Sequence, residues 1–299
     1  MGLRPLLYLM FLGSSWGLYF SLLKIAVLSG IPYIGIATLT TAGVCIGMLA
    51  IAVVRNRKPG FSRQHIIFYI VCALLGYLVP MIVELLVIGH MPASVLTLIV
   101  CLSPMATLIF ARLMRTDTIT KKRVGGMVIG MAAIFVVLFP DAHNSAGVAW
   151  HWLILATVVP CSYALYHNYI SRYWPEGADS FQVACGEAIF AALLLIVVSI
   201  FFWRGDDIGE WNSGYTAILI MATIALVDIY IYFEIIRLRG PIYVSQANYF
   251  MVVSGVIWGM ILFSERLSPW LWLSAALLVV SLLLVNERKQ PEEPAESLS

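Results

Sequence analysis

The sequence predicts an all-α integral membrane protein with ten transmembrane helices. Its 299 residues are 61% hydrophobic and only 11% charged, and their mean hydropathy is +0.93. A soluble globular protein carries about 25% charged residues, so this deficit excludes that class. The apolar runs are continuous and close to the ~20 residues that a spanning helix needs. The strands of a transmembrane β-barrel would instead appear as alternating segments of ~10 residues.

The ten expected helices follow one another through short connections that contain turn residues. The run after Arg4 is too long for a signal peptide and no Ala-x-Ala site follows it, so we interpret it as the first spanning helix. After the tenth helix, residues 288–299 are polar and contain two prolines, which predicts a disordered cytoplasmic tail. The expected spans are 5–28, 33–54, 65–88, 93–113, 122–140, 149–170, 181–203, 214–236, 242–263 and 268–286.

The basic residues predict the orientation of these helices in the membrane. With the N-terminus in the cytoplasm, fifteen of the 18 Lys and Arg residues fall in cytoplasmic loops and ends. Only Lys24, Arg204 and Arg266 fall on the other side. Short cytoplasmic loops are enriched in Lys and Arg, so we expect both termini to be cytoplasmic.

The two halves of the chain resemble each other weakly. The segment "SWGLYF" at 15–20 aligns with "SYALYH" at 162–167, an offset of 147, and "TDTIT" at 116–120 aligns with "SERLS" at 264–268, an offset of 148. Each half contains five expected helices, and because five is odd the second half has to enter the membrane from the opposite side. The pattern therefore predicts a 5+5 inverted-topology repeat, an architecture typical of secondary transporters with a binding site near the midplane.

Two segments, residues 93–138 and 241–285, resemble the EamA repeat of the drug/metabolite transporter superfamily. The features that carry the resemblance are a Ser-Pro pair within a helix, an acid-x-Leu/Ile-Thr/Ser turn and a Gly-rich last helix. The acid of that turn is Asp117 in the first copy and Glu265 in the second.

The resemblance implies a first repeat over residues 1–140 and an inverted second repeat over residues 149–287. It also implies a secondary active transporter, which we expect to be a monomer and multi-pass in the bacterial inner (plasma) membrane. We expect alternating access, efflux, coupling to protons, and an amino acid or related amine as substrate. Transport of organic cations, drugs or other metabolites, including uptake, remains an alternative.

A membrane-embedded sensor or enzyme is the third interpretation, and the residues argue against it. There is no His/Asp/Glu cluster with metal-ligand spacing, no Ser–His or Cys–His constellation, and no phosphate-binding Gly loop. We therefore expect no cofactor, no metal and no nucleic acid, and only a small-molecule substrate and the lipid bilayer as partners.

Asp228 stands near the middle of the expected helix 214–236. A charged acid at the bilayer centre costs roughly 2.5–3.5 kcal/mol on insertion scales, so such residues are functional candidates by default. Asp228 is expected either to bind a cationic group or to carry a proton; the alternative is a permanently neutral or hydrogen-bonded group that only fixes packing. His167 is a second candidate for proton coupling, with a packing role as its alternative.

Four charged residues are related by the repeat. Lys24 is separated from Arg172 by 148 positions, and Glu84 is separated from Glu234 by 150. They predict two ion pairs, Lys24–Glu84 and Arg172–Glu234, that close the outer and inner mouths in turn. Static pairs are the alternative, and Glu234 also has Arg237 three residues along its own helix, within reach of its side chain.

Aromatic and amide side chains near the expected midplane predict the wall of a substrate cavity. Aromatic faces suit apolar side chains or a cation, and amides can satisfy amino or carboxyl groups. The substrate-binding candidates are Trp16, Tyr19, Tyr163, Tyr166, Asp228, Tyr232, Gln246, Asn248 and Tyr249.

Cysteine labelling tests the predicted orientation. In a chain without native cysteines, a membrane-impermeant reagent added outside should modify Asn144→Cys and Asp207→Cys. It should leave Lys58→Cys and Lys121→Cys unmodified, because the cytoplasmic side holds the basic loops. The reverse labelling pattern would overturn the orientation.

Overall fold

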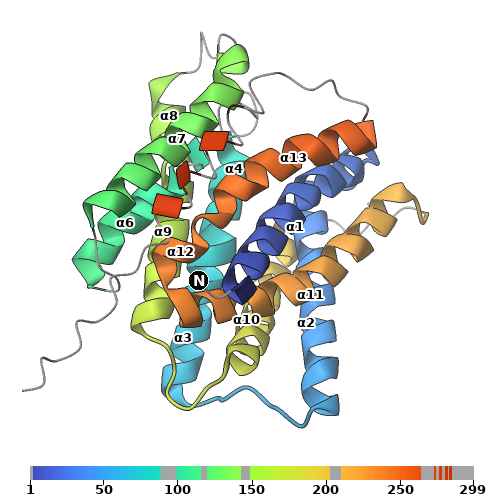
Figure 1. Cartoon of the computed structure of the whole chain (residues 1–299). Helices are drawn as coiled ribbons and strands as arrows, with labels where there is room; N and C mark the ends of the chain where they lie inside the picture. The colour runs from blue at the N-terminus through green and yellow to red at the C-terminus, as the bar shows by residue number, and fades with distance from the viewer. Residues whose placement is uncertain are drawn as a thin grey trace, which may run out of the picture.

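The computed structural model describes residues 3–87, 90, 99–100, 102–115, 120–142, 149–202 and 210–263, with residues 273, 276–277, 280–281 and 283–284 (Figure 1). In this part of the chain every regular element is a helix. The expected span 268–286 lies largely outside the described residues, and the tail 288–299 and the two turn acids, Asp117 and Glu265, lie wholly outside them.

The described helices agree with nine of the expected spans to within a few residues, with the first part of the span 93–113 outside the described residues. The helices of the first half are α1 (Leu3–Leu28), α2 (Tyr33–Val54), α3 (Arg63–Ala73), the π-turn η1 (Leu74–Leu78), α4 (Val79–Val87), α6 (Ser103–Met114) and α7 (Lys121–Ala142). Those of the second half are α8 (Trp150–Ala156), α9 (Val158–Arg172), α10 (Ser180–Phe202), α11 (Ser213–Arg239), α12 (Pro241–Val244) and α13 (Ala247–Phe263). Six helical runs in the described residues are long and apolar enough to cross a membrane. The total of ten crossings stays a prediction.

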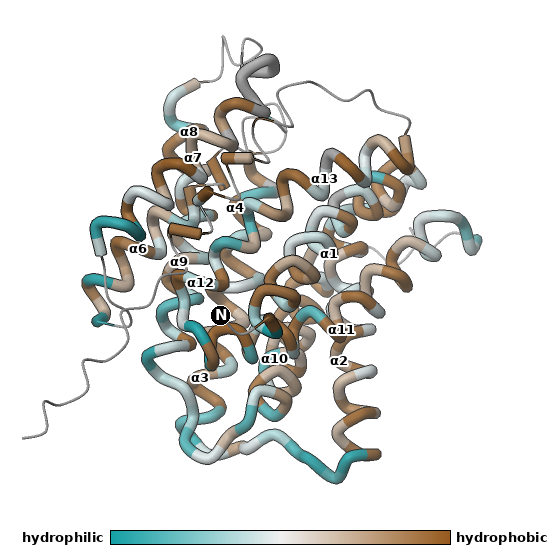
Figure 2. Tube along the Cα trace, viewed as in Figure 1, coloured by the Kyte–Doolittle hydropathy of each residue, from teal (hydrophilic) through white to brown (hydrophobic). Residues whose placement is uncertain are grey.

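The loops that connect the helices are more hydrophilic than the helices themselves. Figure 2 shows apolar colour along most of the helices and hydrophilic colour in the loop between α2 and α3. This loop, residues 55–62, lies beside the 173–179 loop between α9 and α10, to which the Arg57–Asp179 ion pair joins it at 2.6 Å. We call this side of the molecule the basic end. The opposite end holds the α1–α2 turn, where Ser29 Oγ lies 3.1 Å from Ser213 Oγ at the start of α11.

Two of the expected spans are irregular helices. The span 65–88 is one helical run with the π-turn η1 inside it, and the carbonyl of Leu75 in that turn accepts a hydrogen bond from Ser162 Oγ at 2.8 Å. Such turns inside α-helices free backbone groups and are frequent at functional sites. The span 149–170 breaks after Ala156, because Pro160 has no N–H to donate to that carbonyl.

The two halves of the chain interlock. In Figure 1 the blue helix α1 runs beside the orange helix α13, and α1 also packs on α11. Helix α2 packs on α10 and α11, α3 on α10, and α6 on α9. The most extensive helix contacts described therefore join an element of the first half to an element of the second, and the bundle is a single packed unit.

Close approach of α1 and α13 depends on small residues. A Cβ atom added to Gly17 would lie 2.5 Å from the Gly255 nitrogen and 2.9 Å from the Met251 carbonyl oxygen. Ser254 Oγ crosses the contact and donates to the Gly13 carbonyl at 2.8 Å. Helices in lipid associate through packing of this kind, because no hydrophobic driving force acts between them there.

The replacement Gly17→Ala should therefore destabilise the bundle. The added methyl group meets backbone atoms that cannot give way, and overpacking of this kind costs about 1–3 kcal/mol. The matched control is Gly125→Ala on α7, where no described atom lies within 4 Å of the added Cβ. Thermal unfolding of the purified protein in detergent should show a lower Tm for the first variant only; an equal Tm for both would contradict the close contact.

Candidate functional site

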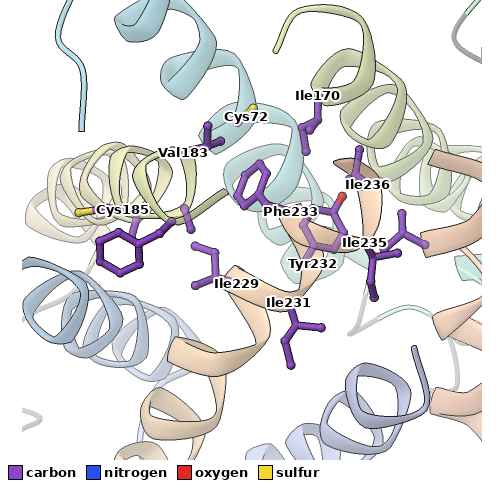
Figure 3. Close-up of a cluster of buried hydrophobic side chains, with 14 of the residues drawn as sticks. Cys72, Ile170, Val183, Cys185, Ile229, Ile231, Tyr232, Phe233, Ile235 and Ile236 are labelled. Carbon is purple, nitrogen blue, oxygen red and sulfur yellow. The ribbon is translucent and has the colours of Figure 1, made fainter. Parts of the chain in front are cut away.

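Aromatic side chains from three helices meet in the interior of the bundle. The rings of Tyr166 on α9 and Tyr232 on α11 are stacked, with centroids 5.4 Å apart and planes 8° apart. Trp16 on α1 and His167 on α9 lie 6.3 Å and 5.7 Å from the Tyr232 ring. Figure 3 shows Tyr232 within the surrounding buried side chains. We call these four residues the aromatic cluster. Three of them, Trp16, Tyr166 and Tyr232, are substrate-binding candidates from the sequence, and His167 is a candidate for proton coupling.

Asp228 lies one helical turn before Tyr232 on α11, so both side chains lie on a similar face of that helix. Its Oδ1 atom accepts a hydrogen bond of 2.7 Å from Ser15 Oγ on α1, and the residue keeps 8% of its surface exposed. Ser15 and Trp16 are neighbours on α1, so α1 contacts α11 at both Asp228 and Tyr232.

Glu187 is a site residue that the sequence analysis missed. It lies on α10 and is 0% exposed. Tyr166 donates its hydroxyl proton to Oε1 of Glu187, which joins the acid directly to the aromatic cluster. Among the described groups, Oε2 has no hydrogen-bond partner. The signal was present, because Glu187 is the one acid in the apolar run 181–203, and the rule that singled out Asp228 applies to it equally.

A second group of tyrosines surrounds Glu84 on α4, nearer the opposite end. Tyr33, at the start of α2, donates to Glu84 Oε2 at 3.2 Å. Tyr19 on α1 and Tyr163 on α9, two of the substrate-binding candidates, lie within electrostatic range of the same carboxyl group. These two tyrosines thus extend from the aromatic cluster toward the opposite end.

His167 is buried at the edge of the aromatic cluster. Its Nδ1 atom lies 3.3 Å from Thr107 Oγ1, and that hydroxyl donates to the Ser103 carbonyl at 2.8 Å. The Thr107 hydroxyl thus lies between the His167 ring and the Ser103 carbonyl. This contact fixes the ring against α6.

Gln246 lies in the turn between α12 and α13, Asn248 and Tyr249 lie in the first turn of α13, and all three are buried. The Gln246 amide and the Tyr249 hydroxyl contact Met127 on α7, at 3.1 Å to its sulfur and 3.4 Å to its carbonyl oxygen. Tyr249 packs in a hydrophobic cluster with α6 and α7 that is separate from the one around Tyr232. The structure does not bring Gln246 and Tyr249 to the aromatic cluster.

The expected gate pairs are not formed among the described residues. Glu234 is bound instead by Arg237, at 2.8 Å and 3.1 Å to its two oxygens, while Arg172 lies exposed at the end of α9. Lys24 lies over the ring of Phe263 at 4.2 Å, and Glu84 is bound by Tyr33. At the basic end the expected pair is replaced because Arg237 lies one turn from Glu234 on the same helix, where its guanidinium group can contact the carboxylate.

The two gate acids nevertheless have corresponding partners. Glu84 is bound by the hydroxyl of Tyr33 at the start of α2, and Glu234 by the hydroxyl of Ser180, at 2.7 Å, at the start of α10. Ser180 follows Tyr33 by 147 positions and Glu234 follows Glu84 by 150, offsets close to those of the sequence repeat. In each half the acid is thus bound by the first residue of a neighbouring helix. Glu84 of the first half is bound toward the opposite end, and Glu234 of the second half is bound at the basic end.

A cavity of about 470 Å³ lies at the basic end between α3 and α9, and the candidate residues do not line it. None of its lining residues is acidic, and none belongs to the aromatic cluster. Its walls are formed by Arg63, Gln64, Ile67, Phe68, Tyr169 and Tyr173.

Comparison with known proteins gives agreement over nearly the whole chain. The model of the EamA-like transporter family matches residues 3–139 and again residues 150–287. The "Uncharacterized transporter YvbV" of Bacillus subtilis (strain 168) is 22% identical over 298 residues, which are 98% of this chain and 94% of that protein. One solved crystal structure aligns with a TM-score of 0.70 at 16% identity, covering 93% of this chain and 96% of the other, and is similar in fold.

A double-mutant cycle tests which partner holds Glu234. The variants Glu234→Gln and Arg237→Gln should be coupled by about 0.5–1 kcal/mol in thermal stability, because Arg237 is half exposed and solvent weakens the pair. The matched pair Glu234→Gln and Arg172→Gln should give additive effects. Coupling of Glu234 to Arg172 and not to Arg237 would contradict the arrangement described here.

Proposed function

Since this chain belongs to the EamA-like transporter family and is a multi-pass integral membrane protein, we propose that it is a secondary active transporter of an amino acid or a related amine. The transporter works by alternating access and is coupled to protons. We place the basic end in the cytoplasm, because the short loops there carry most of the Lys and Arg residues. The proposed direction is efflux, which the resemblance to EamA proteins implies.

The single observation that carries the substrate class is the surrounding of Asp228. Its carboxyl group is buried, has Ser15 as its hydrogen-bond donor, and belongs to a residue one helical turn from Tyr232, whose ring lies 6.3 Å from that of Trp16. An acid at this depth attracts a positively charged group, and the faces of aromatic rings add cation–π attraction of about 0.5–2 kcal/mol. Asp228 is therefore the proposed subsite for the amino group of the substrate.

The aromatic cluster also supports a second candidate function. Stacked tyrosines and a tryptophan beside one carboxylate suit a quaternary or aromatic cation, which needs ring faces but no hydrogen-bond acceptor. Transport of an organic cation or drug is the function favoured by that observation. The two candidates differ in whether the substrate has N–H groups that can donate hydrogen bonds to the Asp228 carboxylate.

The test is a transport screen in proteoliposomes containing the purified full-length chain. Labelled amino acids, polyamines and quaternary amines are offered in exchange assays, and at least one amine should be transported. Asp228→Asn should reduce its exchange at least tenfold, since the interaction with the charged amino group is lost. The control Glu210→Gln alters an exposed acid at the opposite end and should leave exchange unchanged.

Full exchange of every amine by folded Asp228→Asn would remove Asp228 from the site. Transport confined to quaternary amines would select the second candidate function.

A further inference from the structure

Glu187 is the most thoroughly enclosed acid in the described part of the chain. Its side chain is 0% exposed, compared with 5% for Glu234 and 8% for Asp228. Its Oε1 atom is bound by the Tyr166 hydroxyl, but its buried Oε2 atom has no described partner. Buried polar atoms in native proteins almost always have a hydrogen-bond partner, so the position of Oε2 points to a ligand.

The titratable groups on the elements packed around this part of α10 carry no positive charge, as far as the described residues go. They are Cys45 on α2, Tyr69 and Cys72 on α3, Tyr77 on η1, Tyr166 and the imidazole of His167 on α9, and Asp228 and Tyr232 on α11, with no Lys or Arg among them.

The lack of a counter-charge separates Glu187 from Glu234. Both are buried glutamates, but Glu234 has Arg237 at 2.8 Å. A buried carboxylate ion without such a partner costs several kcal/mol. The smallest ligand that removes this cost at an enclosed position is a proton, and no substrate-sized group fits at a side chain with no exposed surface.

The hydroxyl of Tyr232 supplies the acceptor that a protonated carboxyl group requires. It is buried, and its ring is stacked on the ring of Tyr166, which binds the other oxygen of Glu187. In the ionised state, both tyrosine hydroxyls can instead donate to the two carboxylate oxygens.

We propose that Glu187 is the proton-binding site of the transport cycle, distinct from the substrate subsite at Asp228; this rests on the proposed function. In the enclosed surroundings seen here Oε2 holds the proton. When one end of the bundle opens, water reaches the carboxyl group, its O–H bond breaks, and the proton passes to water. The remaining carboxylate is held by Tyr166 and Tyr232 until water at the other end returns a proton.

Infrared difference spectroscopy of the full-length protein in liposomes tests the proton directly and needs no substrate. Wild-type protein should show a band from a protonated carboxyl group at neutral pH, and Glu187→Gln should lose it. The matched control Glu234→Gln should lose no such band, because Arg237 keeps Glu234 ionised. Asp228→Asn should keep the band of Glu187.

Tyr166→Phe gives a second readout in case Glu187→Gln does not fold. It leaves the acid in place but removes the donor to Oε1, so the carbonyl band of Glu187 should move to higher frequency. Unchanged bands in both folded Glu187→Gln and Tyr166→Phe would overturn the proposal.

A transport assay tests whether the cycle uses this proton. For the amine identified in the exchange screen, Glu187→Gln should lose the acceleration that an imposed pH gradient gives over the variant's own exchange rate, whereas Asp228→Asn should lose exchange itself. Gradient-driven accumulation by Glu187→Gln at the wild-type rate would refute the role of Glu187. Failure of the wild-type protein to transport any amine would refute the proposed function instead, and the infrared bands would still decide whether Glu187 holds a proton.

Discussion

An acidic side chain buried in a membrane bundle has to be compensated within the protein, because hydrocarbon offers no hydrogen bonds. The described acids meet this constraint in different ways. Hydroxyl groups alone bind Asp228, Glu84 and Glu187, whereas Glu234 has a guanidinium partner as well. The hydroxyl bonds join α11 to α1, α4 to α2, α10 to α9 and α11 to α10, so each acid connects two helices. The positions of these helices and the chemistry of the site therefore depend on the same contacts.

Interlocking of the two halves gives these connections a mechanical consequence. Helices α1 and α2 lie on α10, α11 and α13, so any opening of one end moves first-half helices against second-half helices. A hydrogen bond to a neutral acid contributes only about 1 kcal/mol, whereas leaving one member of a buried ion pair uncompensated costs about 3–5 kcal/mol. Breaking a hydroxyl–carboxyl contact such as Tyr33–Glu84 therefore costs less free energy than breaking one of the ion pairs expected from the sequence.

Apolar run length was enough to predict the helices, because the bilayer sets the length of a spanning element. The scarcity of acids in hydrocarbon was enough to single out Asp228, and the same scarcity applies to Glu187, which was overlooked. The sequence could not show which side chains contact one another across the bundle. Glu234 lies beside both Arg237 and Ser180, and only the first is visible as a sequence spacing. The placement of Tyr249 against α7 depends on the turn at residues 245–246, which rotates the rest of the span in a way that apolar composition does not report.

Access to the site from both sides of the membrane is the central claim, and thiol labelling measures it most directly. Ala225 lies three residues before Asp228 on α11 and is partly buried beside the site. In a chain whose five native cysteines are replaced, Ala225→Cys should react with an impermeant reagent from either side, and the transported amine should protect it on both. Labelling from one side only, unaffected by amine and by pH gradient, would contradict alternating access at this site.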